Sequence, residues 1–271
     1  MTSRWADLDR PPLSERALRT ALIRPDSFVT DLRVVAETGS TNDDVAALAR
    51  AGAPEGTVLV AEAQTTGRGR LDRTWTSPPR AGLTFSVLLR PAAVPLPRRT
   101  WIPLLTGLAV HRAVSRLGQV ETRLKWPNDL LLGDELGKAG GILAQSGGDA
   151  VVVGIGLNVT TQRAELPPGA TSLAVEAAGC TDRDPVLRAV LRGLGDLYRG
   201  WDGNPARIRA DYEAACDTIG REVRVQLPDG TALTGTATGL DDTGRLVVRT
   251  PGGDRAVSAG DVTRVRPVTT G

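Results

Sequence analysis

A change of pattern after residue 218 constrains the fold of this 271-residue chain more than any other feature. Beyond it, short segments with alternating apolar residues, such as Val223, Val225 and Leu227, are separated by turns rich in Gly, Pro and Asp. These segments are too short for helices, and period-2 alternation is typical of strands. Four or five strands in about fifty residues predict a small SH3-like β-barrel. We therefore divide the chain into residues 1–218 and 219–271.

The first 218 residues alternate between helical and strand patterns. Apolar residues recur at helical spacing in some segments, and Ser14 stands where a helix N-cap is expected. The 31 Gly and 18 Pro indicate many turns, which favours a β-rich or mixed architecture over a helical bundle. Helices are predicted over residues 13–23, 41–52, 101–117, 184–201 and 206–216. Strands are predicted over residues 56–64, 82–91 and 149–159, a strand that runs into a turn over residues 31–40, and strand segments around a loop over residues 122–132 and 139–146.

Composition narrows the classes of function. The net charge of +2 gives little general attraction to nucleic acid or membrane, and no apolar run approaches the roughly 20 residues that span a bilayer. The N-terminus lacks the apolar core of a secretory signal, so we expect a cytoplasmic protein. Cys180 and Cys216 have no metal-like spacing and are expected to be reduced thiols. With His111 as the one histidine, the chemistry must use Lys, Arg, Asn, Asp and backbone groups.

The stretch "GRGRLDRTW", residues 67–75, concentrates three arginines and two glycines in one short loop. Glycine lets a backbone approach a ligand closely, and guanidinium groups bind phosphate or carboxylate in a bidentate manner. The loop therefore predicts a site for an anion. A solvated surface loop is the alternative. A role in binding single-stranded nucleic acid would need interleaved aromatic side chains, and only Trp75 is near.

Two further segments carry cationic side chains beside turns. In "LKWPNDLLL", Lys125 and Asp129 flank a proline turn and could both address a nucleotide or its Mg²⁺. In "GKAGGIL", Lys138 precedes small residues that would let it reach a buried anion without crowding. An ordinary turn and an exposed loop lysine are the respective alternatives.

Two other segments indicate no function when each is taken alone. "GIGLNV" contains Gly154 and Gly156, but the third glycine of a dinucleotide-binding fingerprint is missing. "GSTND" places the hydrogen-bonding side chains of Ser40, Thr41 and Asn42 together in a turn. No GxxxxGK[ST] loop occurs, which argues against a P-loop NTPase.

Taken in order, "GSTND", "AEAQTTGRGRLDRTW", "LKWPNDLLL", "GKAGGIL" and "GIGLNV" closely resemble the motifs of the biotin protein ligases, from about Thr38 to Val159. The resemblance implies an α+β catalytic domain with a mixed sheet flanked by helices, followed by the small barrel. It also implies the activity: biotin and ATP react to give biotinyl-5′-AMP and pyrophosphate, and the biotinyl group then passes to a lysine of a biotin carboxyl carrier protein. Mg²⁺ is the implied cofactor.

The resemblance also assigns roles to residues. The implied catalytic residues are Lys138, Arg68 and Arg70, and the implied metal residue is Asp129. The implied biotin-binding residues are Ser40, Thr41, Asn42, Gln64, Gly67, Arg68, Gly69, Arg70 and Lys138, and the implied nucleotide-binding residues are Arg70, Lys125, Trp126, Asn128 and Asn158.

Three departures from the family pattern are visible. Asp72 stands where the family loop usually has glycine, and Ala139 and Gly140 replace the residues that usually follow the motif lysine. Only about 38 residues precede "GSTN", too few for the winged helix-turn-helix of the dual-function members. We therefore expect a ligase-only protein that binds no specific DNA and no membrane, either a monomer or a weak homodimer. A lipoyl or octanoyl transferase of the same fold and a nucleic-acid-binding regulator are the alternatives.

Overall fold

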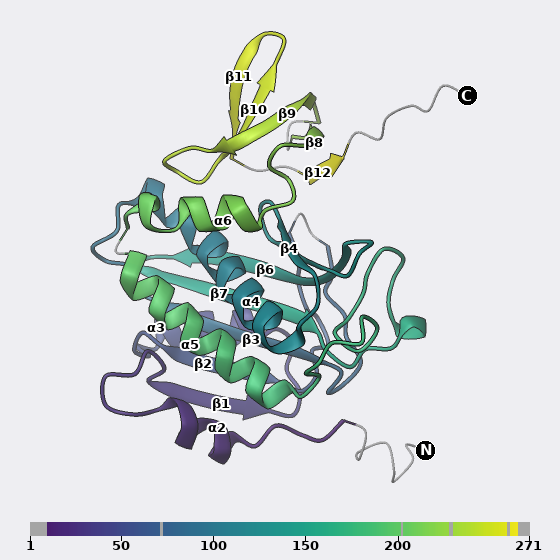
Figure 1. Cartoon of the computed structure of the whole chain (residues 1–271). Helices are drawn as coiled ribbons and strands as arrows, with labels where there is room; N and C mark the ends of the chain where they lie inside the picture. The colour runs from purple at the N-terminus through teal and green to yellow at the C-terminus, as the bar shows by residue number, and fades with distance from the viewer. Residues whose placement is uncertain (1–9, 71–72, 202, 228–229, 259–260, 265–271) are drawn as a thin grey trace.

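The computed structural model describes residues 10–70, 73–201, 203–227, 230–258 and 261–264. Asp72, one of the departures from the family pattern, lies outside these ranges. The described chain contains a seven-stranded mixed sheet with helices on both faces and a separate five-stranded sheet at the C-terminal end (Figure 1). This arrangement confirms the predicted fold class.

The large sheet has the strand order β1-β2-β3-β7-β6-β5-β4. β1 and β2 are parallel, with α3 as their crossover, and the other neighbouring strands are antiparallel. β4 is an edge strand, and β3 and β7 lie at the centre. The strands are β1 (Asp31–Val35), β2 (Thr57–Ala61), β3 (Gly82–Leu89), β4 (Thr122–Lys125), β5 (Asp129–Leu132), β6 (Gly137–Gly147) and β7 (Ala150–Asn158).

The helices cover the two faces of this sheet unequally. α4 and α5 lie side by side over one face (Figure 1) and bury the larger apolar core. α3 packs on the opposite face, where Leu59, Leu88 and Val152 meet Val45 in a smaller cluster. The α-helices are α2 (Glu15–Leu22), α3 (Thr41–Arg50), α4 (Ile102–Gly118), α5 (Arg183–Trp201) and α6 (Arg209–Ala215), and 3-10 turns span Leu96–Trp101, Arg163–Glu165 and Pro205–Arg207.

Period-2 alternation explains how one strand serves both faces. Along β3, Phe85, Val87 and Leu89 belong to the core under α4 and α5, whereas Leu88 faces α3. Ser86, also fully buried, continues the row on the α3 side and replaces an apolar residue with a hydroxyl. Because successive side chains of a strand point to opposite faces, the α3 side becomes polar toward the N-terminal end of β3. That change marks the place of the candidate site.

The C-terminal sheet is antiparallel throughout, in the order β11-β10-β9-β8-β12. It confirms the predicted SH3-like unit, and α6 lies between it and the body of the chain (Figure 1). Its apolar residues join the same buried cluster as the helices of the first unit. The division at residue 218 stays a prediction. The strands are β8 (Glu222–Gln226), β9 (Ala232–Leu240), β10 (Leu246–Thr250), β11 (Gly253–Val257) and β12 (Asp261–Arg264).

Helices that could cross a membrane are absent from the described residues, because none combines the necessary length with sufficient hydropathy.

Candidate functional site

The floor of the candidate site is a row of residues that crosses four strands. Asp129 of β5 pairs with Gly141 of β6, Gly141 pairs with Gly156 of β7, and Gly156 pairs with Thr84 of β3. All four residues line a cavity of about 260 Å³ on the α3 side of the sheet. The two central positions are glycines, so no side chain of the strands themselves rises from the middle of the row, and the Trp75 ring lies over it.

The glycines of "GIGLNV" are explained by close neighbours on this face. A Cβ on Gly156 would lie 2.4 Å from Cε2 of Trp75, and a Cβ on Gly154 would lie 2.1 Å from Oδ1 of Asn42. Carbon atoms in ordinary contact are about 3.5–4.0 Å apart, so neither position accommodates a larger residue without movement. The glycines therefore allow Trp75 and Asn42 to lie against β7, and no dinucleotide-binding turn is involved.

The N-terminal end of α3 forms one wall of the cavity. Ser40 is its N-cap, and its hydroxyl makes no capping hydrogen bond. The backbone N–H of Thr41 donates to Oε1 of Gln64 at 2.8 Å, which ties the helix to the segment after β2. This wall therefore carries hydroxyl and amide groups on a helix terminus, where the dipole is positive.

Asn42 is held by its own network. Its Oδ1 is hydrogen-bonded to the Ser86 hydroxyl at 2.6 Å, and its Nδ2 donates to the backbone oxygen of Leu143 at 3.2 Å and to Gln145 Oε1 at 3.0 Å. The Ser86 hydroxyl also contacts Thr41 Oγ1 at 2.7 Å. Asn42 lines the cavity, but both ends of its amide are engaged by the protein. The sequence analysis did not identify Ser86 or Gln145, because neither residue belongs to one of the five motifs.

The arginine–glycine loop folds back on itself above this wall. The Gly69 N–H donates to the Arg73 carbonyl at 2.6 Å, and the Trp75 N–H donates to the Gly67 carbonyl at 2.9 Å. Arg68 forms an ion pair with Asp43 of α3. The half-exposed Arg68 side chain thus joins the loop to the same helix end that forms the wall.

Gly67 lies at the base of the loop rather than on the cavity surface. It is buried, it does not line the cavity, and a Cβ there would lie 2.3 Å from the Trp75 carbonyl oxygen. Its implied contact with biotin stays a prediction. In the structure, Gly67 lets the backbone at the base of the loop pass close to the backbone of Trp75.

The "KWPND" segment is the turn of the β4–β5 hairpin. Lys125 pairs with Asp129 at the strand ends, and Trp126, Pro127 and Asn128 connect them, with a cis peptide bond before the proline. Asn128 Oδ1 accepts a hydrogen bond from Arg70 Nη1 at 3.1 Å, so the hairpin turn contacts the arginine–glycine loop across the cavity.

Lys138 reaches the cavity because β6 contains a bulge. The register changes between Leu130 and Leu131, so that Leu130 pairs with Gly140 and Leu131 with Lys138. Ala139, the unpaired residue, is fully buried in the core under α4. A β-bulge re-aims neighbouring side chains, and here it places Lys138 on the cavity face together with Gly141. Lys138 thus lies in a strand and not in a loop, and its role in the chemistry stays a prediction.

The Lys138 ammonium donates to Oδ1 of Asp129 at 2.7 Å. The Lys138 backbone is also fixed, because its N–H donates to the Gly169 carbonyl and its own carbonyl accepts from the Thr171 N–H, both at 2.9 Å. The Gly140 departure from the family pattern fits this packing, since a Cβ there would lie 2.9 Å from the Gly156 carbonyl oxygen.

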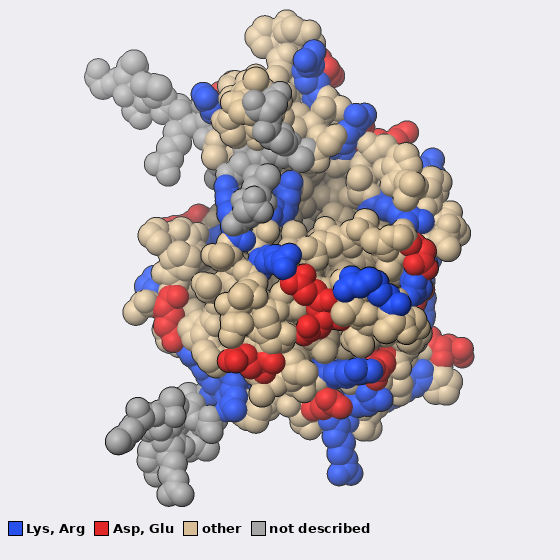
Figure 2. Space-filling view, turned by 180° about the vertical axis from the view of Figure 1, so that it is seen from behind, with Lys and Arg blue, Asp and Glu red and all other residues tan. Residues whose placement is uncertain are grey.

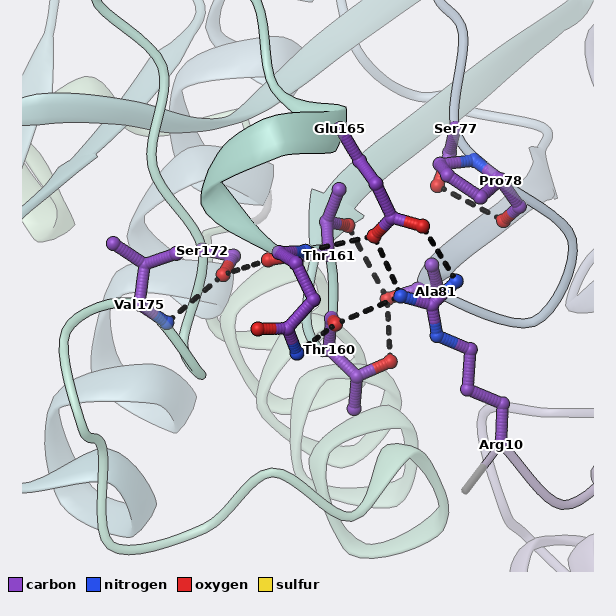
Figure 3. A network of polar contacts seen from close by, with 10 residues as sticks. Arg10, Ser77, Pro78, Ala81, Thr160, Thr161, Glu165, Ser172 and Val175 are labelled. Carbon is purple, nitrogen blue, oxygen red and sulfur yellow. Dashed lines mark hydrogen bonds and ion pairs between the residues drawn. The ribbon is translucent and has the colours of Figure 1, made fainter. Parts of the chain in front are cut away.

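The opposite wall consists of the loop from residue 160 to residue 171, which no motif had indicated. Arg10 donates to both carboxylate oxygens of Glu165 and to the Thr160 carbonyl, and the Ser172 hydroxyl donates to the Thr161 carbonyl (Figure 3). The hydrogen bond from Arg10 lowers the pKa of Glu165, so this carboxyl is ionised at neutral pH. The network braces the wall against β3 through the Ala81 carbonyl.

The cavity thus brings together almost every residue implied by the resemblance. Its lining includes Ser40, Thr41, Asn42, Gln64, Arg68, Gly69, Arg70, Lys125, Trp126, Asn128, Asp129, Lys138 and Asn158. Lining residues without an assigned role include Trp75, Thr84, Thr161, Glu165, Ala170 and Val262. Trp75 was already part of the arginine-loop motif, whereas Val262 belongs to the C-terminal sheet and no local pattern could place it here.

A larger hollow of about 860 Å³ adjoins the cavity and shares Arg68, Arg70 and Asn128 with it. Arg99 and Arg245 also line this hollow, so its border is basic. Figure 2 shows the face turned away from α4 and α5, where the surface is hollowed beneath the C-terminal sheet and Lys and Arg side chains gather around the depression.

His111 and the two cysteines lie away from this chemistry. None of them lines the cavity. Burial and the nearby Arg123 and Arg112 lower the pKa of His111, and burial raises the pKa of the Cys216 thiol. Within the part of the chain that the structure describes, no group of three or more His, Cys, Asp or Glu side chains could hold a metal ion.

Comparison with known proteins agrees with this geometry. The family model described as the Biotin/lipoate A/B protein ligase family matches residues 35–160, and the model described as the Biotin protein ligase C terminal domain matches residues 218–264. The chain is 45% identical over 270 residues to the biotin--[acetyl-CoA-carboxylase] ligase of Mycobacterium tuberculosis, covering 98% of this chain and 100% of that relative. It is 34% identical over 233 residues to the bifunctional ligase/repressor BirA of Bacillus subtilis, covering 82% of this chain and 70% of that relative.

A solved structure of the biotin protein ligase from Aquifex aeolicus in complex with biotin and ATP has the same fold. The TM-score is 0.74 at 31% identity, over 87% of this chain and 100% of that one. Fold, cavity and matches together define the class of biotin and lipoate ligases. The chain belongs to the biotin protein ligase family, as its five motifs predicted.

Proposed function

We propose that this protein is a biotin–[biotin carboxyl carrier protein] ligase that activates biotin with ATP and transfers it to a carrier lysine. The observation that carries the proposal is the single cavity, which collects all the implied site residues except Gly67 from five separate segments of the chain. Its relatives named as ligases support the same activity.

Biotin occupies the end of the cavity at α3 in this proposal. Its ureido group is a neutral donor and acceptor, which hydroxyl and amide side chains such as Ser40 and Gln64 suit best. Its ring needs an apolar wall, and Trp75 lies against Gly156 to provide one. The Trp75 indole Nε1 is buried and has no hydrogen-bond partner among the described residues, which makes it a further donor on this side.

The cationic side chains meet where the two substrates react. Arg70, Lys125 and Lys138 line the cavity from three different segments. They reduce the repulsion between the biotin carboxylate and the α-phosphate, and they stabilise the charge that develops as pyrophosphate leaves. The Asp129 carboxylate holds the Lys138 ammonium in position on the cavity face.

The chemistry needs no protein nucleophile. A biotin carboxylate oxygen attacks the α-phosphorus of ATP, the bond to the β-phosphate oxygen breaks, and pyrophosphate leaves. The neutral amine of the carrier lysine then attacks the biotinyl carbonyl, forms an amide, loses a proton and expels AMP. This scheme suits a cavity without His or Cys on its surface.

Mg²⁺ fits the proposal as a companion of the ATP phosphates. Mg²⁺ usually binds one or two carboxylates together with substrate phosphates, and among the described residues Asp129 and Glu165 are the carboxylates that line the cavity. Bound there, the ion would neutralise phosphate charge. We assign the Mg²⁺ ion to Asp129, because carboxylate oxygens are the ligands that Mg²⁺ prefers.

The partner in this proposal is the biotin carboxyl carrier domain of an acetyl-CoA carboxylase or related enzyme. The basic hollow beside the cavity gives the carrier lysine a path to the adenylate. A cytoplasmic location, a monomeric or weakly dimeric state and the absence of specific DNA binding belong to the same proposal.

Biotin-dependent exchange of labelled pyrophosphate into ATP tests this function, together with transfer of biotin to a purified carrier domain. The proposal expects both reactions with biotin and neither with lipoate or octanoate. Exchange driven by lipoate or octanoate, with none driven by biotin, would instead assign the protein an activity that adenylylates those acids, and no exchange with any of the three acids would favour an acyl transferase of the same fold.

A further inference from the structure

Trp126 stands at the junction between the cavity and the C-terminal unit. It opens the three-residue turn between Lys125 and Asp129, the paired ends of β4 and β5. Its side chain is only 2% exposed, and its neighbours Lys125 and Asn128 line the cavity. A shift of Trp126 would therefore shift the side chains on the nucleotide side of the site.

Trp126 is held by two hydrogen bonds to residues outside its own hairpin. Its backbone N–H donates to Oγ1 of Thr218 at 3.0 Å. Its indole Nε1 donates to the Gly244 carbonyl at 3.1 Å. One acceptor is the last residue before the C-terminal unit, and the other lies in the turn between β9 and β10 of the C-terminal sheet.

The first acceptor belongs to a segment that covers the outer side of β4. Leu124 forms a parallel bridge with Cys216, and the Asp217 N–H donates to the Leu124 carbonyl at 2.8 Å. Because β4 is the edge strand, this segment is its only backbone partner on that side among the described residues. The chain entering the C-terminal unit thus fixes the strand that carries Lys125.

The second acceptor lies in a turn that is held by internal hydrogen bonds and packs closely against α4. Asp241 Oδ1 accepts from the Thr243 N–H at 2.8 Å and from the Arg245 N–H at 3.0 Å. Gly244 has φ of +73°, which favours glycine, and a Cβ there would lie 2.9 Å from Cδ1 of Leu104 on α4. Trp101 Nε1 donates to the Asp242 carbonyl at 2.9 Å.

We propose that Thr218 and Gly244 are positioning residues for the nucleotide half of the site and act through Trp126. Neither residue lines the cavity, although Gly244 lines the adjoining hollow, and the contact that each makes with the nucleotide side is its hydrogen bond to Trp126 of the hairpin turn. The biotin half is built from α3 and the segment after β2, which neither residue touches. The C-terminal sheet thereby sets ATP binding selectively. This inference rests on the proposed ligase function.

Two pairs of full-length variants test the inference. Thr218→Val removes the hydroxyl acceptor at nearly constant volume, and Thr218→Ser retains it. Gly244→Ala displaces the turn, and Gly230→Ala is its matched control, with φ of +83° and no atom within 4 Å of the added Cβ. The KM values for ATP and for biotin and the kcat are measured by biotin-dependent pyrophosphate exchange.

Thr218→Val and Gly244→Ala are expected to raise the KM for ATP by about two- to tenfold, the range that one net hydrogen bond supports, with the KM for biotin unchanged. Thr218→Ser and Gly230→Ala are expected to match the wild type. Circular dichroism and thermal unfolding establish that each variant is folded.

A purely structural role would lower the active fraction, and hence the apparent kcat, without changing either KM, and that result would overturn the inference. Equal defects in Thr218→Ser and Thr218→Val would overturn it as well. A wild-type protein without biotin-dependent exchange would instead overturn the proposed function itself, so the two failures are distinguishable.

Discussion

Gly156→Ala tests the explanation of the cavity floor. The added Cβ would lie 2.4 Å from Cε2 and 2.7 Å from Cζ2 and Nε1 of Trp75. Carbon contacts of about 3.5–4.0 Å are normal, so the indole must move by roughly 1 Å. Gly156 is not among the glycines with positive φ, and its strand is paired on both sides. The backbone therefore accepts alanine, and the ring is the part that moves.

The displaced ring would alter the wall against which we place the biotin ring. A misplacement of about 1 Å in a positioned group can cost on the order of 100-fold in rate. We expect kcat/KM for biotin to fall between about tenfold and 100-fold, mainly through KM, with the KM for ATP changing less. Pyrophosphate exchange at varied biotin concentration measures this difference.

Gly147→Ala is the matched control, because Gly147 ends the neighbouring strand β6 and an added Cβ there has no atom within 4 Å. Its kinetics should equal those of the wild type. A Gly156→Ala protein that is folded and retains the wild-type KM for biotin would refute the assignment of Trp75 and Gly156 to the biotin wall.

Three further predictions concern charged groups. Arg70→Ala should release biotinyl-5′-AMP faster, by about tenfold or more because a charge-assisted contact is lost, and unchanged release of the adenylate in a stopped-flow or filter assay would contradict this. Lys138→Ala should slow adenylate formation in single-turnover experiments far more than it lowers the midpoint of thermal unfolding; adenylate formed at the wild-type rate would remove Lys138 from the chemistry. Because the Arg10 hydrogen bond lowers the pKa of Glu165 from 4.5, the Arg10–Glu165 pair should stabilise the fold above pH 4.5 and lose that effect as the pH falls through the lowered pKa. Urea denaturation at several pH values should therefore show a difference between wild type and Glu165→Gln that is constant near neutrality and shrinks in acid, and a difference that grows in acid would contradict the pairing.

The strands and helices could be predicted from the sequence because local patterns determine them. The period-2 runs after residue 218 became five strands, and the apolar segment predicted as a helix from residue 101 became α4. The motif order identified the family for the same reason, since each motif is a continuous piece of chain.

Other features depended on distant contacts that a local pattern does not contain. The role of Gly154 and Gly156 requires Asn42 and Trp75, which approach β7 from elsewhere in the chain. The orientation of Lys138 requires a bulge in β6, which shifts its register against β5. The wall around Glu165 and the contribution of the C-terminal sheet carried no recognisable motif at all.

The most direct test of the central claim, that one cavity activates biotin and holds the adenylate, is a crystal structure of the full-length protein after incubation with biotin and ATP. The account predicts biotinyl-5′-AMP in the cavity, with the biotin ring between Trp75 and the end of α3 and the phosphoryl group beside Arg70 and Lys138. A ligand bound with its biotin ring away from Gly156, or biotin and nucleotide in separate pockets, would contradict it.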